Sequence, residues 1–575
     1  MRRSLLFFAL TVCLWFPHEV TAAAPAPAQG RRGMVVTSQA DATRAGVSLL
    51  AAGGNAVDAA VAAAFALCVT EPFASGLGGG VFLLLRSLHG EIVALDARET
   101  APAAAHRDLY VQPGVSERAS LDGVLAVATP GLVAGLLEAL ERYGTKSRRK
   151  VLEPAIRLAE EGFVIGAYHA RVLAEETARI SWAAFPETRA LQFPPDGESI
   201  EIGWRLLQPE LARTLRRIAQ FGREGFYSGP VAEALIAEVK RAGGILSAED
   251  LAGYQVRWRA PVRGEYRGFE VISFPPPSSG GVALIEMLHI LEGIDFSARP
   301  AGSSASLHVL AEAMKLAFAD RAAHLGDPGY VEVPTTALLS KPYAAQLRGR
   351  INPPRWRRPP WTWFRDEVAI RVAGPGLPPR DAGTTHLSVV DAQGNAVAIT
   401  QTINTPFGSG ISVPGTGVIL NNEMDDFARA PNEPNSYGLV DVQGKNAIAP
   451  GKRPLSSMAP TFVMRDGELF LVTGSPGGPR IITTVLQTLV NVLDYGMDVQ
   501  AAVSAPRIHH QWLPDRIVLE PEIPADVIEG LRQRGHTVEV SEKHWSAAES
   551  IGVDRKRGWY YGASDPRRDG LAQGL

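Results

Sequence analysis

Residues 383–404 read "GTTHLSVVDAQGNAVAITQTIN", and this stretch predicts an antiparallel hairpin. Two runs rich in β-branched residues flank the turn residues "DAQGN" at 391–395. Counting back from a turn centred on Gln393 places Thr384 opposite Thr402, although other turn types are compatible with a one-residue slip. The hairpin therefore predicts two threonine hydroxyls close together where a strand begins.

The segment before this strand, residues 352–383, is rich in proline, arginine and tryptophan and ends in "GPGLPPRDAG". Proline lacks a backbone N–H and restricts the residue before it, so such a segment cannot hold a regular ladder of hydrogen bonds. We expect a linker or an exposed tail that stops where the strand starts.

Residues 1–24 have the order of a secretory signal peptide. Arg2 and Arg3 precede an apolar run from Leu5 to Phe16, and small residues follow at 22–24. A run of about a dozen apolar residues is too short to cross a hydrocarbon core about 30 Å thick. We therefore expect export, with the mature chain in the periplasm or outside the cell.

Cysteine is nearly absent from the expected mature chain. Cys13 lies inside the apolar run and follows the bulky Val12, which does not favour lipidation. Removal of the signal peptide leaves Cys68 alone, so the mature chain has no internal disulfide and no thiolate metal site.

The composition is that of a globular protein. The chain has 575 residues, of which 46% are hydrophobic and 20% charged, and its formal net charge is -3. A charge this small gives no net field for nucleic acid or an anionic membrane, so no nucleic-acid partner is expected. The length suggests about four domains, but layered folds can exceed that as one unit, so the domain count stays open.

Helix and strand patterns alternate along the chain. Apolar residues at helical spacing between Asp41 and Val69, broken at 53–54, predict two closely packed helices. Runs at 80–87 and 91–98 predict a hairpin around 89–90, and further helices are expected over 128–144 and 151–163. No period of 20–50 residues repeats, which excludes solenoids and propellers.

Several catalytic motifs are missing. The glycines of "GLGGG" at 76–80 precede a strand and no Gly-Lys-Ser/Thr follows, so close packing or a tight turn is favoured over a phosphate loop. The pair His509 and His510 has no third ligand at helical spacing. No serine has glycine two residues before and two after it, which excludes a serine hydrolase elbow.

Three polar motifs together suggest an amino-acid pocket. "NNEMDDF" at 421–427 supplies carboxylates for an ammonium, while Arg98 and the serines of "RPLSSM" at 453–458 supply a guanidinium and hydroxyls for a carboxylate. The "SPGG" stretch offers the backbone N–H groups of Gly477 and Gly478 either to a substrate oxyanion or merely to a turn.

These motifs, in this order, resemble the γ-glutamyltransferase family. The resemblance rests on "GGNAVDAAVAAAFAL", "DARETAP", "TTHLSVVDAQGNAVAITQTIN", "GVILNNEMDDF", "KRPLSSMAPT", "LVTGSPGGPRIITTVLQ" and "APRIHHQWLPD", and spans residues 34–570. It implies an α+β fold, the four-layer αββα sandwich of N-terminal nucleophile hydrolases. It also implies a precursor that cuts itself into a large subunit, 25–383, and a small catalytic subunit, 384–575, which stay associated.

The resemblance also implies a role for each motif residue. The cut falls between Gly383 and Thr384, and Thr384 becomes the nucleophile. Thr402 and Asn404 support it and the substrate amine, and the amides of Gly477 and Gly478 stabilise the oxyanion. The substrate's α-ammonium is held by Glu423 and Asp426, and its α-carboxylate by Arg98, Ser456 and Ser457. A loop with Tyr437 resembles a lid over the pocket.

The implied chemistry agrees with the residues. A threonine hydroxyl needs a base, and an α-amine released by cleavage, with a reference pKa near 7.7 to 8.0, can serve as one. The expected substrates are glutathione and other γ-glutamyl compounds, the acceptors are water, amino acids or dipeptides, and no metal or organic cofactor is called for. The alternatives are a same-fold acylase acting on another amide, such as a cephalosporin side chain, and a secreted binding protein without chemistry.

Overall fold

A computed structural model describes residues 25–179, 182–194, 200–351, 383–430 and 432–575. The expected signal peptide at 1–24 and almost all of the Pro/Arg/Trp-rich segment at 352–383 lie outside these residues. No helix in the described ranges is long and apolar enough to span a bilayer.

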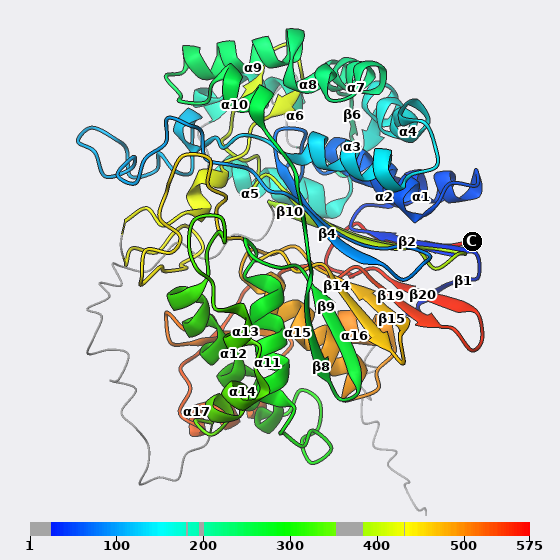
Figure 1. The fold of residues 1–575 in the computed structure, drawn as a ribbon, viewed down its shortest axis with the longest axis vertical. Coiled ribbons are helices and arrows are strands. Elements are labelled where there is room, and N and C mark those ends of the chain that lie inside the picture. The colour runs from blue at the N-terminus through cyan, green and yellow to red at the C-terminus, as the bar shows by residue number, and fades with distance from the viewer. Residues whose placement is uncertain (1–24, 180–181, 195–199, 352–382, 431) are drawn as a thin grey trace, which may run out of the picture.

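Two antiparallel sheets lie face to face in the middle of the molecule (Figure 1). The first sheet has, in spatial order, β21 (Leu571–Gly574), β2 (Gly33–Thr37), β10 (Thr384–Asp391), β11 (Ala396–Thr402), β3 (Gly80–Arg86), β4 (Ile92–Ala97) and β7 (Arg257–Arg259). The second has β1 (Ala28–Gly30), β20 (Trp559–Ala563), β19 (Ser550–Asp554), β15 (Glu468–Thr473), β14 (Thr461–Arg465), β9 (Phe269–Ser273) and β8 (Val262–Tyr266).

A separate hydrophobic core joins the two sheets. It includes Val36 and Phe82 from the first sheet and Phe462 from the second. The rings of Phe82 and Phe274 stack with centroids 4.0 Å apart, an arrangement that adds about 0.5–1.5 kcal/mol to the burial of their surface. Alternating side chains of both inner faces thus hold the sheets together.

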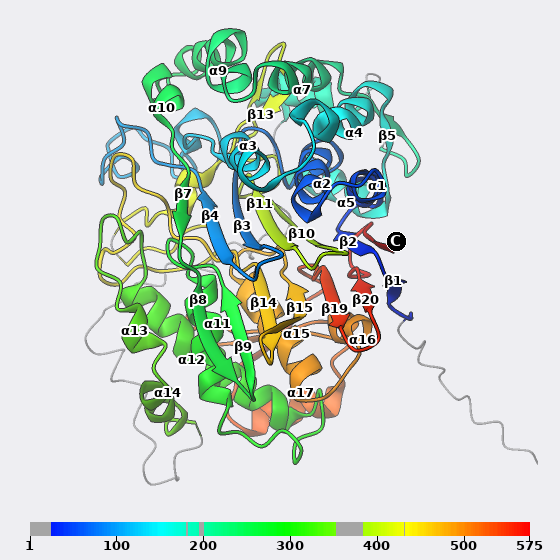
Figure 2. The ribbon, with the colours of Figure 1, turned by 45° about the vertical axis from the view of Figure 1, so that its right-hand side comes forward.

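One helical layer covers the outer face of the first sheet, at the top of Figure 2. Its inner helices are α1 (Ala40–Ala51), α2 (Ala56–Thr70), α3 (Leu132–Tyr143) and α4 (Arg148–Glu161), with α7 (Pro209–Phe221), α8 (Glu224–Tyr227), α9 (Gly229–Arg241) and α10 (Ala248–Gly253) farther out. Every residue of α2 is buried, because its alanines let neighbouring helices approach on all sides.

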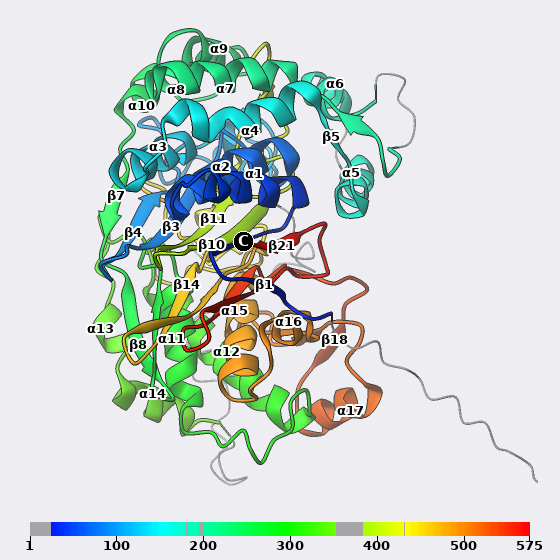
Figure 3. The ribbon, with the colours of Figure 1, turned by 90° about the vertical axis from the view of Figure 1, so that its right-hand side faces the viewer.

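A second helical layer covers the other sheet, at the bottom of Figure 3. It contains α11 (Gly280–Leu291), α12 (Ser304–His324), α13 (Thr335–Leu338), α14 (Lys341–Arg348), α15 (Arg480–Leu493), α16 (Val499–Ser504) and α17 (Ala525–Gln533). The expected α+β sandwich of four αββα layers is therefore confirmed.

Smaller elements connect the layers. They are α5 (Ala167–Arg179), α6 (Pro186–Gln192), the strand pair β5 (Phe163–Val164) and β6 (Arg205–Leu206), the pair β12 (Ser412–Val413) and β13 (Val418–Ile419), and the three strands β16 (Ile508–His509), β17 (Ile517–Leu519) and β18 (Val538–Val540).

Most sequence-based elements are confirmed, with shifts at their ends. The break between α1 and α2 falls where expected, since Gly53 has a φ of 73° and Asn55 caps α2. Residues 128–131 were expected to be helical, but they are not, because Thr129 forms a β-bridge with Thr100. The helix expected over 151–163 begins earlier, at Arg148 after the cap Ser147, and ends before Gly162, whose φ is 77°.

Candidate active site

The first residue of β10 is Thr384, in the middle of the first sheet, and its side chain is buried. The β10–β11 register pairs Thr384 with Thr402, as the turn chemistry predicted. Their hydroxyl oxygens are 2.9 Å apart.

The hydroxyl of Thr402 uses its full hydrogen-bonding capacity. It donates to the carbonyl oxygen of Gly383 at 2.7 Å and accepts the N–H of Asn404 at 2.8 Å. A hydroxyl has one proton and two acceptor sites, so the remaining contact is the Thr384 hydroxyl donating to Thr402. The Gly383 carbonyl oxygen also accepts the N–H of Ile403 at 3.1 Å.

Glycine is required at position 383 by the space around it. A β-carbon there would lie 1.9 Å from the carbonyl oxygen of Asn404. The peptide bond before Thr384 is therefore held against β11 in a position that a larger residue cannot take.

The "GLGGG" stretch packs closely against β11, as expected. A β-carbon on Gly79 would lie 2.0 Å from the Thr402 carbonyl oxygen, and one on Gly80 would lie 2.1 Å from Oε2 of Glu99. Gly79 thus lets the chain before β3 lie against β11, and Gly80 leaves room for the Glu99 side chain.

A small pocket opens beside Thr384. It brings together nearly all the residues that the sequence singled out: Arg98, Thr384, Thr402, Asn404, Glu423, Asp426, Tyr437, Ser456, Ser457 and Gly478. Gly383 and Gly477 adjoin it in the chain, so the predicted set is assembled at one place.

Arg98 is the central charge of this pocket and is 1% exposed. It forms ion pairs with Glu423 and Asp426, and its Nε donates to the Pro454 carbonyl oxygen at 3.3 Å. Burial by itself would lower the pKa of Arg98, but attraction from these carboxylates outweighs burial and raises it. Arg98 therefore stays charged.

A carboxyl pair lies behind Arg98. Glu99 lies 4.0 Å from the Arg98 guanidinium and beside the carboxyl group of Glu423. Burial raises the pKa of both carboxyl groups, which favours a proton held between them. Burial raises the pKa of Glu99 to about 7, against the effect of Arg98.

The two serines lie on a loop that is fixed from behind. The carbonyl oxygen of Ser456 accepts the backbone N–H of Ser279 at 2.7 Å and its hydroxyl at 2.7 Å, and Arg321 donates to that hydroxyl at 3.1 Å. Ser457 follows at the pocket wall. The residue before α11 and Arg321 of α12 therefore fix the backbone of Ser456.

Tyr437 covers one side of the pocket. Its hydroxyl donates to the Asn404 carbonyl oxygen at 2.8 Å, and a β-carbon on Gly478 would lie 2.6 Å from its ring. Gln511 holds the same segment by donating to the Tyr437 carbonyl oxygen at 2.9 Å. The sequence motif "APRIHHQ" thus contributes to the expected lid.

The glycine loop between β15 and α15 faces the pocket. Gly477 and Gly478 have φ values of 127° and 55°, which favour glycine, and within the described part of the chain neither N–H has an acceptor. Both backbone donors are therefore open to an acceptor.

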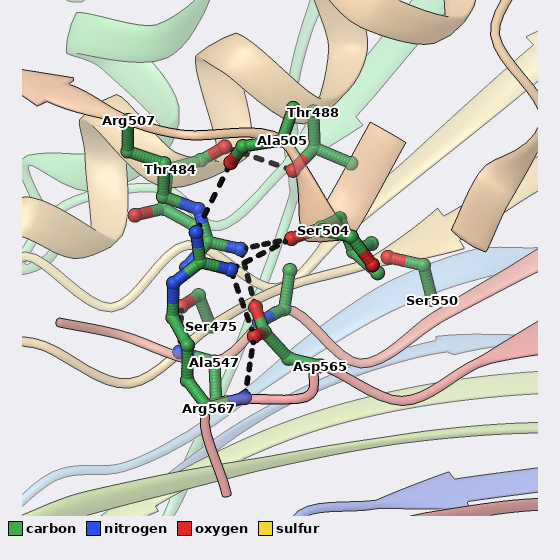
Figure 4. Close-up of polar contacts among 12 residues, drawn as sticks. Ser475, Thr484, Thr488, Ser504, Ala505, Arg507, Ala547, Ser550, Asp565 and Arg567 are labelled. Atoms are coloured by element: carbon green, nitrogen blue, oxygen red, sulfur yellow. Dashed lines mark hydrogen bonds and ion pairs between the residues drawn. The ribbon is translucent and has the colours of Figure 1, made fainter. Parts of the chain in front are cut away.

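A buried ion network lies close to Ser475, two residues before Gly477 (Figure 4). Arg507 and Arg567 both pair with Asp565, whose carboxylate accepts the N–H of Ala548 at 2.9 Å. The next residue back, Ala547, donates its N–H to the Ser475 hydroxyl at 3.2 Å. Glu520 completes the network by pairing with Arg567 at 2.6 Å.

The sequence analysis missed two of the residues that hold the nucleophile and Arg98. Arg568 donates to the Thr384 carbonyl oxygen at 3.0 Å, and Tyr254 donates to the Arg98 carbonyl oxygen at 2.8 Å. Neither carries a local signal, since each lies more than 100 positions from its partner. Glu99, next to Arg98 in "DARETAP", could have been noticed.

The paired histidines have structural partners. Nδ1 of His509 lies 2.9 Å from the Thr483 hydroxyl, and Nε2 of His510 lies 3.2 Å from the carboxylate of Asp515.

Two sheets between helical layers, with a buried threonine starting a central strand, define the class of N-terminal nucleophile hydrolases. The γ-glutamyltranspeptidase family model matches residues 42–575, and the chain belongs to this family.

Similar proteins agree with this assignment. The chain is 45% identical over 546 residues to a glutathione hydrolase proenzyme of Escherichia coli, with 94% of this chain and 91% of that protein covered. A crystal structure of Helicobacter pylori γ-glutamyltranspeptidase is 42% identical, with a TM-score of 0.53 over 55% of this chain and 90% of that one. A cephalosporin acylase from Bacillus halodurans is 29% identical, with a TM-score of 0.82 over 99% of both chains.

Proposed function

We propose that this chain is a precursor that cleaves itself between Gly383 and Thr384 and then acts as a γ-glutamyltransferase and glutathione hydrolase. The products of cleavage are a large subunit, 25–383, and a small catalytic subunit, 384–575. The observation that carries the proposal is the contact of the Thr384 and Thr402 hydroxyls beside the Gly383 carbonyl.

Cleavage uses the groups already in contact. The Thr384 oxygen attacks the Gly383 carbonyl carbon and passes its proton to Thr402, which in turn hands its own proton to the carbonyl oxygen, while the Ile403 N–H also stabilises that oxygen. The C–N bond then breaks, the nitrogen takes up a proton, and an ester joins Gly383 to the threonine oxygen. Water hydrolyses the ester and leaves Thr384 with a free α-amine.

Turnover uses that amine as the base. It accepts the Thr384 hydroxyl proton as the oxygen attacks the γ-carbonyl of the donor, and the N–H groups of Gly477 and Gly478 stabilise the oxyanion. The leaving amine takes a proton and departs, and the γ-glutamyl ester on Thr384 passes to water or to the amine of an amino acid or dipeptide.

The donor's amino-acid head fits the charges beside Thr384. Its carboxylate is held by Arg98, Ser456 and Ser457, and its ammonium by Glu423 and Asp426, with the side chain of Asn404 alongside. Arg98 already pairs with the carboxylates of Glu423 and Asp426. A zwitterionic head group adds one negative and one positive charge, so the net charge of the pocket does not change. A head group lacking either charge leaves a buried ion unpaired.

The substrate class follows from the pocket and its cover. The pocket is small and lined by Arg98, Glu423 and Asp426, which suits a charged glutamyl group, and Tyr437 covers one side of it. The second candidate is an acylase acting on a cephalosporin side chain, which the likeness to the cephalosporin acylase structure favours. The head-group residues Arg98, Asp426, Ser456 and Ser457 distinguish the two, because an acylase for another side chain does not need them.

The location of this activity follows from the first 24 residues. Their charged, apolar and small-residue order favours export to the periplasm or the exterior, where γ-glutamyl compounds and acceptor peptides would be met.

The direct test compares purified wild-type protein with Thr384→Ala. We expect the wild type to give two bands on a denaturing gel and to release glutamate from glutathione, with γ-glutamyl-dipeptide appearing when a dipeptide is added. The variant should remain one chain without activity. A Thr384→Ala variant that still splits into two chains would refute the assignment of Thr384 as the nucleophile. Cleaved wild-type protein that acts on a cephalosporin amide but not on glutathione would favour the acylase.

A further inference from the structure

A second cluster of ligand-type side chains lies far from Thr384, in the helical layer beneath the second sheet. His308 and Glu312 are one turn apart on α12 and so share a helix face, and His536 follows α17, which packs against α12 (Figure 3). Nδ1 of His308 lies 2.6 Å from Nε2 of His536, and Nδ1 of His536 lies 3.9 Å from Oε1 of Glu312. One ligand atom from each residue lies within 4.8 Å of the others.

The donor set matches a first-row transition metal. Two imidazole nitrogens and one carboxylate oxygen are the ligands of many zinc sites with three protein ligands and a water, and they are poor ligands for magnesium or calcium. A neutral imidazole ring is the form that binds a metal.

The geometry needs only small changes to close on an ion. With metal–ligand distances of about 2.0–2.2 Å and tetrahedral angles, ligand atoms lie about 3.4 Å apart. The His308–His536 pair would open by about 0.8 Å, and the Glu312 carboxylate would approach by about 1.4 Å at most. The proton between the two rings would move to the outward nitrogen of its own ring.

Neighbouring polar contacts hold the two sides of this cluster in place. Nζ of Lys315, one turn after Glu312 on α12, donates to both carboxylate oxygens of Asp515 at 2.6 and 2.7 Å. The same carboxylate contacts Nε2 of His510 at 3.2 Å. Lys315 is therefore neutralised locally, and α12 is fixed against the segment that leads to His536.

We propose that His308, Glu312 and His536 bind one zinc(II) ion, with water as the fourth ligand. If the chain is cleaved before Thr384, as proposed above, His308 and Glu312 belong to the large subunit and His536 to the small one. The ion then joins the two subunits at a point remote from the pocket, and it stabilises their association without taking part in the reaction.

The test is a calorimetric titration of untagged, EDTA-stripped protein with zinc chloride. We expect one zinc ion per large and small subunit pair and a higher thermal midpoint with zinc, while magnesium and calcium chloride give neither. His536→Ala and Glu312→Gln should each weaken zinc binding by about tenfold or more. Glu312→Gln keeps the side chain's size, so it remains informative if the alanine variant folds poorly.

His544→Ala is the matched control, because His544 also lies in the small subunit and contacts a glutamate, Glu522, at an exposed site. It should bind zinc as the wild type does. Absence of saturable binding in the wild type, or equal affinity in the wild type and Glu312→Gln, would refute the site. So would loss of binding in the His544 variant alone.

The uncleaved Thr384→Ala protein separates this inference from the proposed function. It should bind zinc with wild-type affinity, because all three ligands are present in the precursor. In the processed enzyme, zinc should raise the urea concentration at which the subunits separate on a sizing column. If the wild-type protein binds zinc but is never cleaved, the proposed cleavage is refuted and the metal site is not. If zinc does not change the urea concentration at which the subunits of the processed enzyme separate, the proposal that the ion joins the subunits is refuted.

Discussion

The hydroxyl of Thr402 should set the rate of self-cleavage, and Thr402→Val tests this with a side chain of the same shape. The substitution removes a donor at 2.7 Å from the Gly383 carbonyl oxygen and the acceptor for the Thr384 proton at 2.9 Å. The Ile403 N–H at 3.1 Å remains as the other donor to that oxygen. Loss of one oxyanion donor typically costs about 2.7–4 kcal/mol, so processing should slow by about 10²–10³-fold.

The assay follows purified precursor by denaturing gel electrophoresis from the start of incubation at 25 °C. Thr402→Ser keeps the hydroxyl and should process within about tenfold of the wild type. Thr400→Val is the matched control, because Thr400 is buried on the same face of β11 and its hydroxyl contacts Nδ1 of His386 at 2.8 Å instead. Its effect on stability should resemble that of Thr402→Val, but its processing should be near normal.

Two results would refute the reasoning. A Thr402→Val precursor that splits within a few-fold of the wild-type rate would show that the hydroxyl neither stabilises the oxyanion nor accepts the proton. Equal slowing in Thr400→Val would show that the loss comes from a disturbed sheet rather than from the hydroxyl at Gly383.

Three further outcomes are expected. Tyr437→Phe removes the hydrogen bond to the Asn404 carbonyl, worth about 1 kcal/mol, so KM for glutathione should rise about fivefold; an unchanged KM would argue against the lid. Gly383→Ala should stay uncleaved on a gel, because the added carbon falls 1.9 Å from the Asn404 oxygen; normal splitting would contradict that contact. Because burial raises the pKa of Glu99 to about 7 from 4.5, the folded protein keeps a proton that the unfolded chain releases. The free energy of unfolding of the wild type relative to that of Glu99→Gln should therefore fall as pH rises from about 4.5 through about 7. Urea unfolding of both proteins at pH 5 and pH 8 measures this difference, and an equal difference at the two pH values would exclude the shared proton.

Local patterns were sufficient for the central part of the fold. The turn "DAQGN" and the alternating residues beside it predicted the pairing of Thr384 with Thr402, which the β10–β11 register confirms. The two small-residue helices were also predicted, because helical periodicity and the break at Gly53 are both local signals. The ends of α3 and α4 were less well predicted, since a β-bridge at Thr129 and the cap at Ser147 decide them.

The motif residues of the site were identified from the sequence, but their contacts were not. The motifs suggested which side chains meet a zwitterion, yet they gave no sign that Arg98 itself pairs with Glu423 and Asp426. Those pairs join residues more than 300 positions apart, and no periodicity reports on such distances. The contacts of Ala547 with Ser475 and of Ala548 with Asp565 also join residues distant in sequence, so they could not be predicted either.

The sequence by itself determined the chemistry available to this protein: a threonine after glycine, a glycine-rich loop and a set of opposite charges, each written in a few consecutive residues. Only the tertiary structure decided how that chemistry is tuned, because proton sharing between Glu99 and Glu423 and the proximity of His308 to His536 depend on burial and on distances across the packed layers. Local sequence sets backbone preferences and side-chain types, whereas electrostatic environment is a property of the assembled fold.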